Sequence, residues 1–289
     1  MKRTINQILH SKATLEGAGV RLKRAFGYNE VPLFDPFLLL DHFGSRNPED
    51  YVKGFPWHPH RGIETVTYML NGEVEHGDNI GNSGVINSGD IQWMTSGSGI
   101  IHQEMPRRYQ GLMQGFQLWV NLPAKKKMTA PKYRGITKEL LPTVEKEGTK
   151  IKVIAGTIDE TQGPIRDLAV NVEYFDVQLT PGKTFEHKTD RNWKAFAYVI
   201  EGSAHTDDKP IEPQNCALFS EGDTVRIEAD NNLRFLFASG KPLNEPVAWG
   251  GPIVMNTQEQ LANAFQELDD GTFIKPRTKA KPSRDFYQT

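Results

Sequence analysis

The stretch "HPHRGIETVTYMLNGE" runs from His58 to Glu73 and begins with two histidines one residue apart. Side chains at i and i+2 of a strand point to the same face, so His58 and His60 converge if the backbone is extended there. Pro59 favours this geometry because the residue before a proline is pushed toward β or polyproline conformation. Proline cannot donate to a ladder, so we expect this stretch at a strand start or a sheet edge.

A second pair with the same spacing follows in "GSGIIHQEMP", where His102 and Glu104 are again at i and i+2. We call His58 and His60 the first dyad, and His102 and Glu104 the second dyad. On neighbouring antiparallel strands the two dyads would aim three imidazoles and one carboxylate at one point. This donor set suits a borderline divalent transition metal such as Fe, Mn, Ni, Cu or Zn and does not choose among them.

Strand signals dominate the rest of the chain. Runs such as "GFQLWVNL", "VEYFDVQL" and "LRFLFASG" are rich in Val, Phe, Tyr and Leu, and Gly, Asn, Asp and Pro separate them. This pattern predicts an all-β fold of sandwiches or barrels, since parallel sheets would need intervening helices. Two helices are expected, a weak one over 135–148 and a stronger one over 256–271. In the second, Thr257 and Gln260 form a capping box.

An internal repeat predicts two similar β domains. "YMLNGEVEHGD" at Tyr68 is echoed by "YVIEGSAHTDD" at Tyr198, 130 residues later, and "NSGDIQWM" around Gly89 by "SEGDTVRI" around Gly222, 133 residues later. The boundaries expected from this repeat are 1–133 for an N-terminal domain with both dyads, 134–148 for a linker, and 149–289 for a C-terminal domain with a helix and a tail.

Composition excludes several classes of protein. The formal net charge of −2 gives no basic surface for nucleic acid, and no run approaches the roughly 20 apolar residues of a membrane span. Lys125, Lys126 and Lys127 form the densest charge cluster, which we interpret as a solvated linker. One cysteine, Cys216, and no secretory signal indicate a reducing compartment, the cytoplasm, with the nucleus open for a eukaryotic source.

The sequence resembles the pirin family of the cupin superfamily. The likeness covers nearly the full length and rests on "DPFLLLDHFG", "FPWHPHRGIETVTYMLNGEVEHGD", "GDIQWMTSGSGIIHQEMP", "GFQLWVNLP" and "GPIVMNT". It implies a bicupin, two antiparallel jelly-roll-like β-barrels, of which the first binds a metal, usually iron. In pirins the carboxylate ligand comes from the second motif, so the implied ligands are the two dyads. This leaves Glu64 as a structural residue paired with Arg61.

The second half lacks the ligand pattern. "PGKTFEHKTDRNW" contains His187 alone, and "EGDTVRIEAD" contains no histidine. Since a single imidazole does not make a metal site, the second barrel is expected to be a structural partner without metal. His187 and His205 are then expected to be surface or loop residues. With two barrels already packed together, we expect a monomer.

The resemblance implies two functions from different classes. The first is that of a quercetin 2,3-dioxygenase, which opens the central ring of a flavonol with O₂ and releases carbon monoxide. Glu104, as ligand and nearest carboxylate, could accept the flavonol hydroxyl proton. Side chains near the ligands in sequence are pocket candidates, although each is individually expected to be barrel core: Phe55, Trp57, Trp93, Met94 and Met105.

The second implied function is regulation without catalysis. A pirin of this kind acts through protein partners as a transcription co-regulator or metabolic regulator, and the charge of its ion sets partner affinity. A storage-like cupin with a structural ion is a third interpretation, which the histidine-rich donor set disfavours. Fe²⁺ is the expected ion, with Mn²⁺, Ni²⁺, Cu²⁺ and Zn²⁺ as alternatives.

Overall fold

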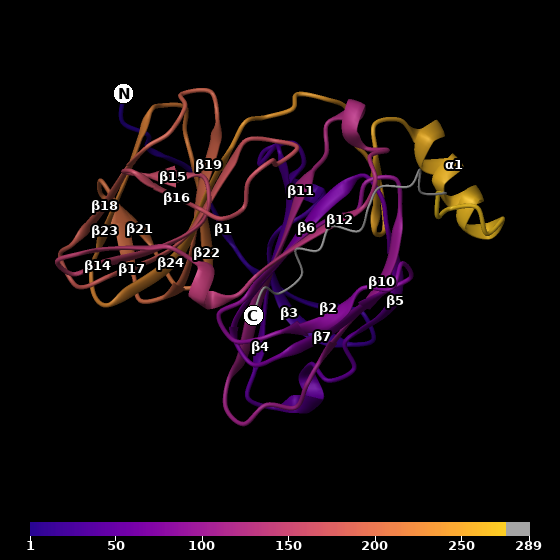
Figure 1. The fold of residues 1–289 in the computed structure, drawn as a ribbon. Helices are drawn as coiled ribbons and strands as arrows, with labels where there is room; N and C mark the ends of the chain where they lie inside the picture. The colour runs from indigo at the N-terminus through magenta and orange to yellow at the C-terminus, as the bar shows by residue number, and fades with distance from the viewer. Residues whose placement is uncertain (276–289) are drawn as a thin grey trace. The chain divides into compact units, whose positions relative to one another are not determined.

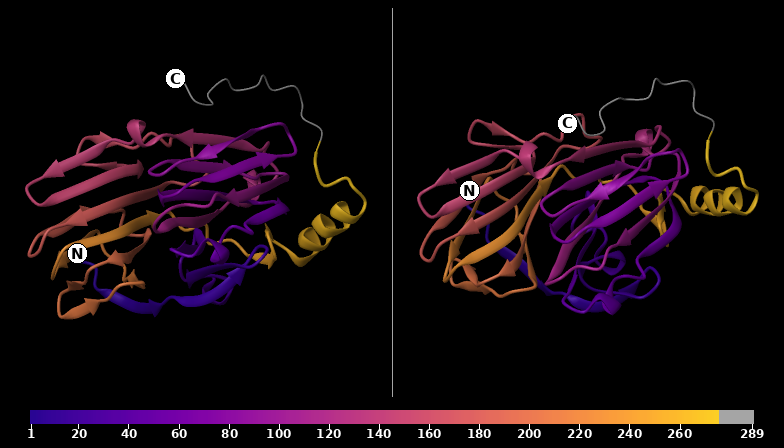
Figure 2. Two further views of the ribbon diagram at one scale, coloured as in Figure 1. Left: turned by 90° about the horizontal axis from the view of Figure 1, so that it is seen from below. Right: turned by 60° about the horizontal axis from the view of Figure 1, so that its bottom comes forward.

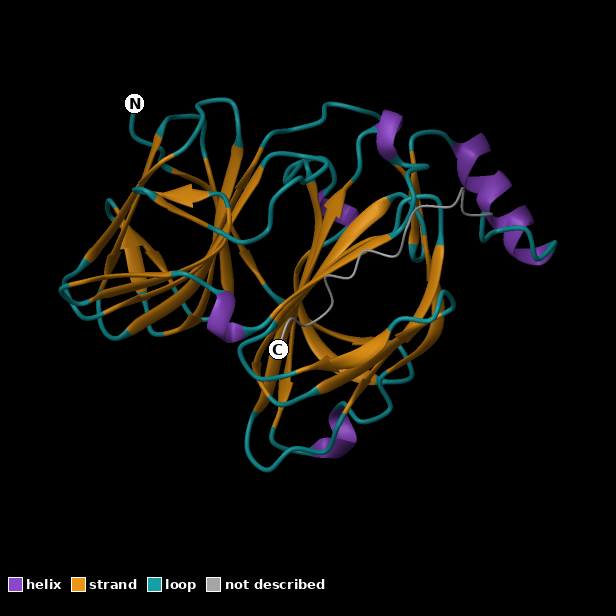
Figure 3. Cartoon of the chain, viewed as in Figure 1, coloured by secondary structure: helices purple, strands orange, loops and turns teal. Residues whose placement is uncertain are grey.

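Strand pairing divides the chain into two units. The computed structural model describes residues 1–275, and strands make up most of them (Figure 3). The first unit comprises Ala13–Arg24, Leu38–Lys138 and Asn244–Thr289. The second unit comprises Met1–Lys12, Ala25–Phe37 and Glu139–Leu243. The tail expected after the C-terminal helix lies largely outside the described residues, which end at 275.

The first unit contains a seven-stranded and a four-stranded antiparallel sheet (Figure 1). The larger sheet has the order β12(Lys132–Ile136), β9(Ile91–Thr95), β6(Ile63–Asn71), β11(Met113–Asn121), β4(Phe37–Ser45), β3(Val20–Phe26), β2(Lys12–Glu16). The smaller sheet has the order β5(Phe55–His60), β10(Ile100–Pro106), β7(Val74–Asp78), β8(Ser83–Ile86). A hairpin and a helix complete the unit: β25(Ala248–Gly250), β26(Ile253–Met255) and α1(Gln258–Asp269).

The second unit repeats this arrangement. Its seven-stranded sheet has the order β1(Ile5–His10), β22(Asn215–Phe219), β19(Lys194–Glu201), β24(Leu233–Gly240), β17(Val172–Leu179), β14(Thr149–Ala155), β13(Thr143–Lys146). Its four-stranded sheet has the order β18(Thr184–Lys188), β23(Thr224–Ala229), β20(Ala204–Thr206), β21(Lys209–Ile211). Shorter elements are β15(Thr157–Ile158), β16(Thr161–Gln162) and the 3₁₀ turns η1(Tyr28–Glu30), η2(Pro48–Asp50), η3(Ala124–Lys126) and η4(Lys138–Leu140), of which η2 and η3 lie in the first unit.

The two sheet orders correspond strand by strand, which confirms the prediction of two similar β domains. β6 and β7 correspond to β19 and β20, the hairpins that the echo at Tyr68 and Tyr198 identified. The second echo aligned β9 with β23, which hold different places in their sheets. β1 fills in the second unit the edge that β12 fills in the first, so the first strand of the chain belongs to the second unit.

Local sequence explains the elements that matter for the site. β6 is rich in β-branched and aromatic residues and is buried along almost its whole length. α1 begins at the expected capping box, in which the Thr257 hydroxyl accepts from the Gln260 backbone N–H at 3.1 Å. Its apolar face packs with β25 and β26 through Leu261 and Ala264. Figure 2 shows α1 following this hairpin near the end of the described chain.

Two expectations about organisation differ from the structure. The helix predicted over 135–148 is wrong: this stretch holds the end of β12, the turn η4 and β13. The expected division into 1–133, 134–148 and 149–289 differs from the observed units at both ends of the chain, because β1 joins the second unit and the segment from Asn244 joins the first. Both departures arise from long-range pairing, which has no local sequence signal.

Candidate metal centre

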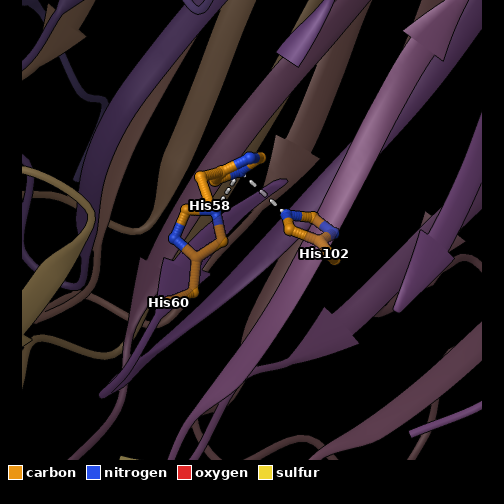
Figure 4. A group of neighbouring side chains, drawn as sticks. All are labelled: His58, His60 and His102. Atoms are coloured by element: carbon orange, nitrogen blue, oxygen red, sulfur yellow. Dashed lines mark hydrogen bonds between the residues drawn. The ribbon is translucent and has the colours of Figure 1, made fainter. Parts of the chain in front are cut away.

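β5 and β10 are neighbours in the four-stranded sheet, and each carries one dyad. In their antiparallel register His58 lies directly opposite His102. Directly opposite residues project to the same face of a sheet, as do residues at i and i+2. His60 therefore shares this face, and the three imidazoles converge (Figure 4).

The three imidazoles have the spacing of metal ligands. Nε2 of His58 lies 3.0 Å from Nε2 of His60 and 3.0 Å from Nε2 of His102. Two ligand nitrogens at right angles, each about 2.1 Å from an ion, lie about 3 Å apart. These three histidines could therefore hold a metal ion.

Backbone carbonyls orient two of the rings. Nδ1–H of His58 donates to the carbonyl of Pro56 at 2.9 Å, and Nδ1–H of His60 donates to the carbonyl of Pro252 at 3.1 Å. We assign the protons to Nδ1 from these carbonyl partners, which leaves Nε2 as the nitrogen with a free lone pair. The facing Nε2 atoms are thus three potential ligand atoms and not mutual donors.

Burial keeps these imidazoles neutral. His60 and His102 are buried and His58 is half-buried. Burial lowers the pKa of His58, and burial together with the neighbouring histidines lowers the pKa values of His60 and His102 well below the usual range. Because a neutral imidazole is the form that binds a metal, the group is prepared for a cation near neutral pH.

Glu104 lies beside the three histidines. Its Oε2 is 4.0 Å from Nε2 of His102, across a register shift in the pairing of β10 with β5. The hydroxyl of Thr67, on β6, donates to its Oε1 at 2.9 Å. Burial raises the pKa of Glu104 to about 7, although the Thr67 hydrogen bond acts in the opposite direction. A cation at the histidines would lower that pKa by its charge.

Glu64 and Arg61 do not form the expected ion pair. Glu64 accepts a hydrogen bond from the Thr95 hydroxyl at 2.6 Å, whereas Arg61 lies 2.6 Å from a carboxylate oxygen of Glu267 on α1. Glu64 and Thr67 are three positions apart on β6, so their side chains point to opposite faces of the sheet. The carboxylate of Glu64 therefore points away from Glu104, and Arg61 pairs with the C-terminal segment instead.

The five pocket candidates divide between the two faces of their strands. Phe55 lies opposite Glu104 and shares its face, and Met94 is buried on the inner face of β9. Trp93 points to the other face of β9, where its indole N–H donates to the carboxylate of Glu64 at 3.0 Å. Trp57 is 54% exposed. Met105 is the residue after Glu104, so its side chain points to the outer face of β10. Only Phe55 and Met94 of the five thus lie on the inner face of their strands.

Two residues near the dyads escaped the sequence reasoning. His76 lies on β7 directly opposite Glu104 and is buried. The sequence could have predicted this position, because side chains alternate along "VEHGD" and His76 therefore points inward with Val74. Trp119 on β11 packs edge-on against His60 with ring centroids 5.2 Å apart, a contact that no local spacing announces.

The lysine run is only partly solvated. Lys127 is 1% exposed, while the two lysines before it are exposed. Its Nζ donates to the carbonyls of Gly62 and Val254, both at 2.9 Å, and to Oδ1 of Asn121 at 2.7 Å. Burial lowers the pKa of Lys127 to about 7. The solvated-linker interpretation is wrong for Lys127, which ties the turn after the first dyad to the C-terminal segment.

The prediction that His187 is a surface or loop residue is wrong. His187 lies on β18, is buried, and its Nε2 is 3.1 Å from a carboxylate oxygen of Glu173. The Ser239 hydroxyl donates to the same oxygen. His205 is partly exposed as expected but lies on β20, with Nδ1 2.6 Å from Asp230.

Within the described residues no helix has the length and apolar character needed to cross a membrane. Glu104 and the three histidines lie on strands of the first unit. The carbonyl of Pro252, in the turn between β25 and β26, contacts His60 of the first dyad.

Comparisons with known proteins agree with this architecture. The family model described as Pirin matches residues 19–120, and the Pirin C-terminal cupin domain matches residues 174–274. A Pirin-like protein of Caulobacter vibrioides is 46% identical over 94% of this chain and 99% of its own. A Pseudomonas aeruginosa protein named "Putative quercetin 2,3-dioxygenase PA3240" is 44% identical over 89% of this chain and 93% of its own.

Among solved structures, a crystal structure named quercetin 2,3-dioxygenase from Acinetobacter baumannii superposes with a TM-score of 0.89. It is 32% identical and covers 94% of this chain and 99% of that chain. Together with the two matched cupin domains, these relatives show that the chain belongs to the pirin family.

Proposed function

We propose that this protein is a metal-dependent dioxygenase that opens the central ring of a flavonol such as quercetin with O₂ and releases carbon monoxide. The observation that carries the proposal is the convergence of three neutral imidazoles, with Nε2 separations of 3.0 Å, beside a buried carboxylate. The names of the Pseudomonas and Acinetobacter relatives point to the same reaction.

We propose the two dyads as the ligand set, with Fe²⁺ as the ion. Three imidazoles and one carboxylate fit Fe²⁺, and they also fit Mn²⁺, Ni²⁺, Cu²⁺ and Zn²⁺. When bound, the ion would supply positive charge that lowers the pKa of a flavonol hydroxyl. The carbonyls of Pro56 and Pro252 hold the first dyad with its Nε2 atoms turned inward, so binding needs little rearrangement of the rings.

Glu104 is the residue proposed to take the hydroxyl proton. Burial raises the pKa of Glu104 to about 7 without an ion, and a bound cation would lower it, so the carboxylate form that accepts a proton would predominate near neutral pH. The Thr67 hydroxyl holds one of its oxygens, which leaves the other oxygen turned toward His102. Phe55 and Met94 supply apolar surface on the same face, as a flat aromatic substrate requires.

The test is oxygen consumption by metal-loaded protein. Purified protein loaded anaerobically with Fe²⁺ should consume O₂ and bleach the flavonol absorbance when quercetin is added, with carbon monoxide as a product. Parallel samples loaded with Mn²⁺, Ni²⁺, Cu²⁺ and Zn²⁺ identify the active ion. Absence of turnover across these metals and a panel of flavonoids would contradict the proposed reaction.

The second candidate function is metal-dependent regulation through a protein partner. One observation favours it: the four-stranded sheet borders a hollow of about 530 Å³, lined in part by Trp57, His76 and Gln103. Trp57 precedes His58 on β5, and Gln103 stands between the two residues of the second dyad on β10. A change at the ligands would therefore reach this surface through a single strand.

We also propose a cytoplasmic location. The one cysteine, Cys216, is a buried free thiol, and burial raises its pKa. A thiol of this kind is inert, and a chain with a single cysteine forms no internal disulfide, as is usual in a reducing compartment.

A further inference from the structure

A fourth imidazole borders the candidate metal centre. His76 lies directly opposite Glu104 in the register of β7 and β10, and such partners have Cβ atoms about 5 Å apart on one face of a sheet. Burial alternates along both strands in step, with His76, His102 and Glu104 all turned inward. His76 therefore faces the same interior space as the second dyad.

The ring of His76 has no partner for either nitrogen. His76 is 5% exposed, and among the described residues no protein atom hydrogen-bonds its Nδ1 or Nε2. Leaving a buried donor or acceptor unpaired costs about 1–3 kcal/mol. Most buried polar groups are paired, so an exception of this kind calls for a physical reason. Tyr133 stacks on the ring with centroids 5.9 Å apart and holds its orientation.

His76 is not one of the grouped ligands. The three histidine nitrogens that lie within 4.8 Å of one another belong to the first dyad and His102 only. A nitrogen outside this group but on the same face, next to Glu104, is placed to meet a molecule bound at the group. It offers one donor and one acceptor when neutral.

We propose that His76 contacts the substrate, and that its imidazole N–H donates a hydrogen bond to the ionised hydroxyl oxygen of a flavonol-type molecule held at the three histidines. This inference rests on the proposed function for the identity of the substrate. The contact made by His76 does not depend on that identity, because it requires only that an anionic oxygen or nitrogen ligand binds beside Glu104. The two side chains then have separate roles: Glu104 takes the hydroxyl proton, and His76 stabilises the resulting anion.

The experiment compares wild type with His76→Phe, which keeps the ring stack but removes both nitrogens, and His76→Gln, which keeps a donor. His187→Gln is the matched control, since it alters a buried histidine of the second unit that already has a partner. Each iron-loaded protein is titrated anaerobically with quercetin and, separately, with azide, a small anion that binds open positions on divalent metals. Metal content and the far-ultraviolet circular dichroism spectrum are recorded for each.

We expect His76→Phe to keep its iron and its fold while binding quercetin and azide about tenfold to a hundredfold more weakly, the loss of one hydrogen bond to a charged group. His76→Gln should recover most of the affinity, and His187→Gln should match wild type. Under aerobic turnover, His76→Phe should show a raised KM as well as a lower kcat.

Wild-type affinity of His76→Phe for both probes would overturn the inference. Loss of iron in both His76 variants would overturn it too, because His76 would then be a ligand of the ion. A wild type that binds no quercetin also contradicts the substrate contact. If wild type binds quercetin but does not turn it over, the dioxygenase proposal fails, while weaker binding by His76→Phe still supports the contact.

Discussion

The two units share one strand order, and their candidate ligand positions differ on one pair of neighbouring strands in the smaller sheet. In the first unit His58 on β5 lies opposite His102 on β10; in the second, His187 on β18 lies opposite Val225 on β23. These strand pairs hold the same place in their sheets. Two residues further along β23, Ile227 stands where β10 has Glu104. The second unit thus has valine and isoleucine in place of the second dyad.

The remaining histidine of that pair is built into the apolar core. His187 has Glu173 as its partner, and its ring lies within 5.9 Å of the centroids of three phenylalanines, Phe175, Phe185 and Phe237. One imidazole with a carboxylate partner is a satisfied core group, whereas three imidazoles whose lone pairs face one another could hold a cation. The comparison teaches that the fold itself does not specify the site. Three positions on one pair of strands do, since the second unit also has Thr189 two residues after His187, where the first unit has His60.

The largest effect should come from making β10 resemble β23. We expect His102→Val to lower the affinity for Fe²⁺ or Zn²⁺ by more than about a hundredfold, a greater loss than removing a hydrogen-bond partner of a ligand causes. The free energy of unfolding of the metal-free variant should nevertheless equal that of wild type or exceed it by about 1 kcal/mol. The reason is that the buried Nδ1 of His102 has no partner among the described residues.

Chelator competition gives the metal affinity, and urea unfolding of the metal-free proteins gives the stability. Val225→Ala in the second unit is the control: it opens a small cavity in the core and should destabilise the protein without altering metal affinity. If His102→Val retained wild-type affinity, the three-histidine site would be refuted.

Glu104 provides the next largest effect, and its sign depends on pH. The pKa of Glu104 is raised to about 7 in the folded protein from an ordinary value of 4.5. Between these values the unfolded chain binds fewer protons, so this group makes the metal-free protein less stable as pH rises from about 4.5 to 7. The full penalty, present above pH 7, is about 3 kcal/mol.

Glu104→Gln should therefore stabilise the metal-free protein by up to about 3 kcal/mol at pH 8 and leave it unchanged at pH 4. Urea unfolding at the two pH values measures this difference. Glu186→Gln replaces an exposed strand glutamate and should show no gain at either pH. Equal stabilities of wild type and Glu104→Gln at pH 8 would mean that the carboxylate is not destabilised by burial.

The contrast between the units also separates what sequence could predict from what it could not. The dyads were predictable because strand alternation is a fixed geometric rule, so two i, i+2 pairs on adjacent strands leave little choice of direction. The absence of the second dyad from the C-terminal half was equally predictable, since "EGDTVRIEAD" contains no histidine. Each dyad, and its absence from the second half, was recognisable from residues close together in sequence.

The surroundings of the dyads could not be predicted in the same way. Pro252 and Glu267 reach His60 and Arg61 from about two hundred residues away, and no spacing rule connects segments so distant. Lys127 was hidden in a run of three lysines, where composition indicates solvent and only tertiary packing selects one member for burial.

A smaller effect should follow from cutting the link between α1 and the residue after the first dyad. Arg61 is buried and its guanidinium also donates to the carbonyls of Ser98 and Phe273, both at 2.8 Å. Breaking a buried ion pair is costly, but Glu267 is partly exposed, so we expect Glu267→Gln to destabilise the protein by only about 1–2 kcal/mol. Iron affinity should fall about threefold to tenfold because His60 precedes Arg61.

The control for this change is Glu259→Gln, which alters an exposed glutamate in the first turn of the same helix. It should leave stability within about 0.5 kcal/mol and iron affinity unchanged. Chelator competition and urea unfolding of both variants separate the two effects. Unchanged iron affinity in Glu267→Gln would show that α1 does not position the first dyad.

The smallest expected effect lies at the histidine that the second unit retains. His187→Gln keeps a donor near Glu173, so it should lower the free energy of unfolding by about 1 kcal/mol and leave the iron content of the protein unchanged. Urea unfolding and elemental analysis of protein purified with Fe²⁺ measure the two quantities. Because Val225 and Ile227 offer no ligand atoms, an ion bound in the second unit would have to rely on His187. Loss of iron in His187→Gln would therefore show that the two units share the metal chemistry, and that the substitutions on β23 do not distinguish them.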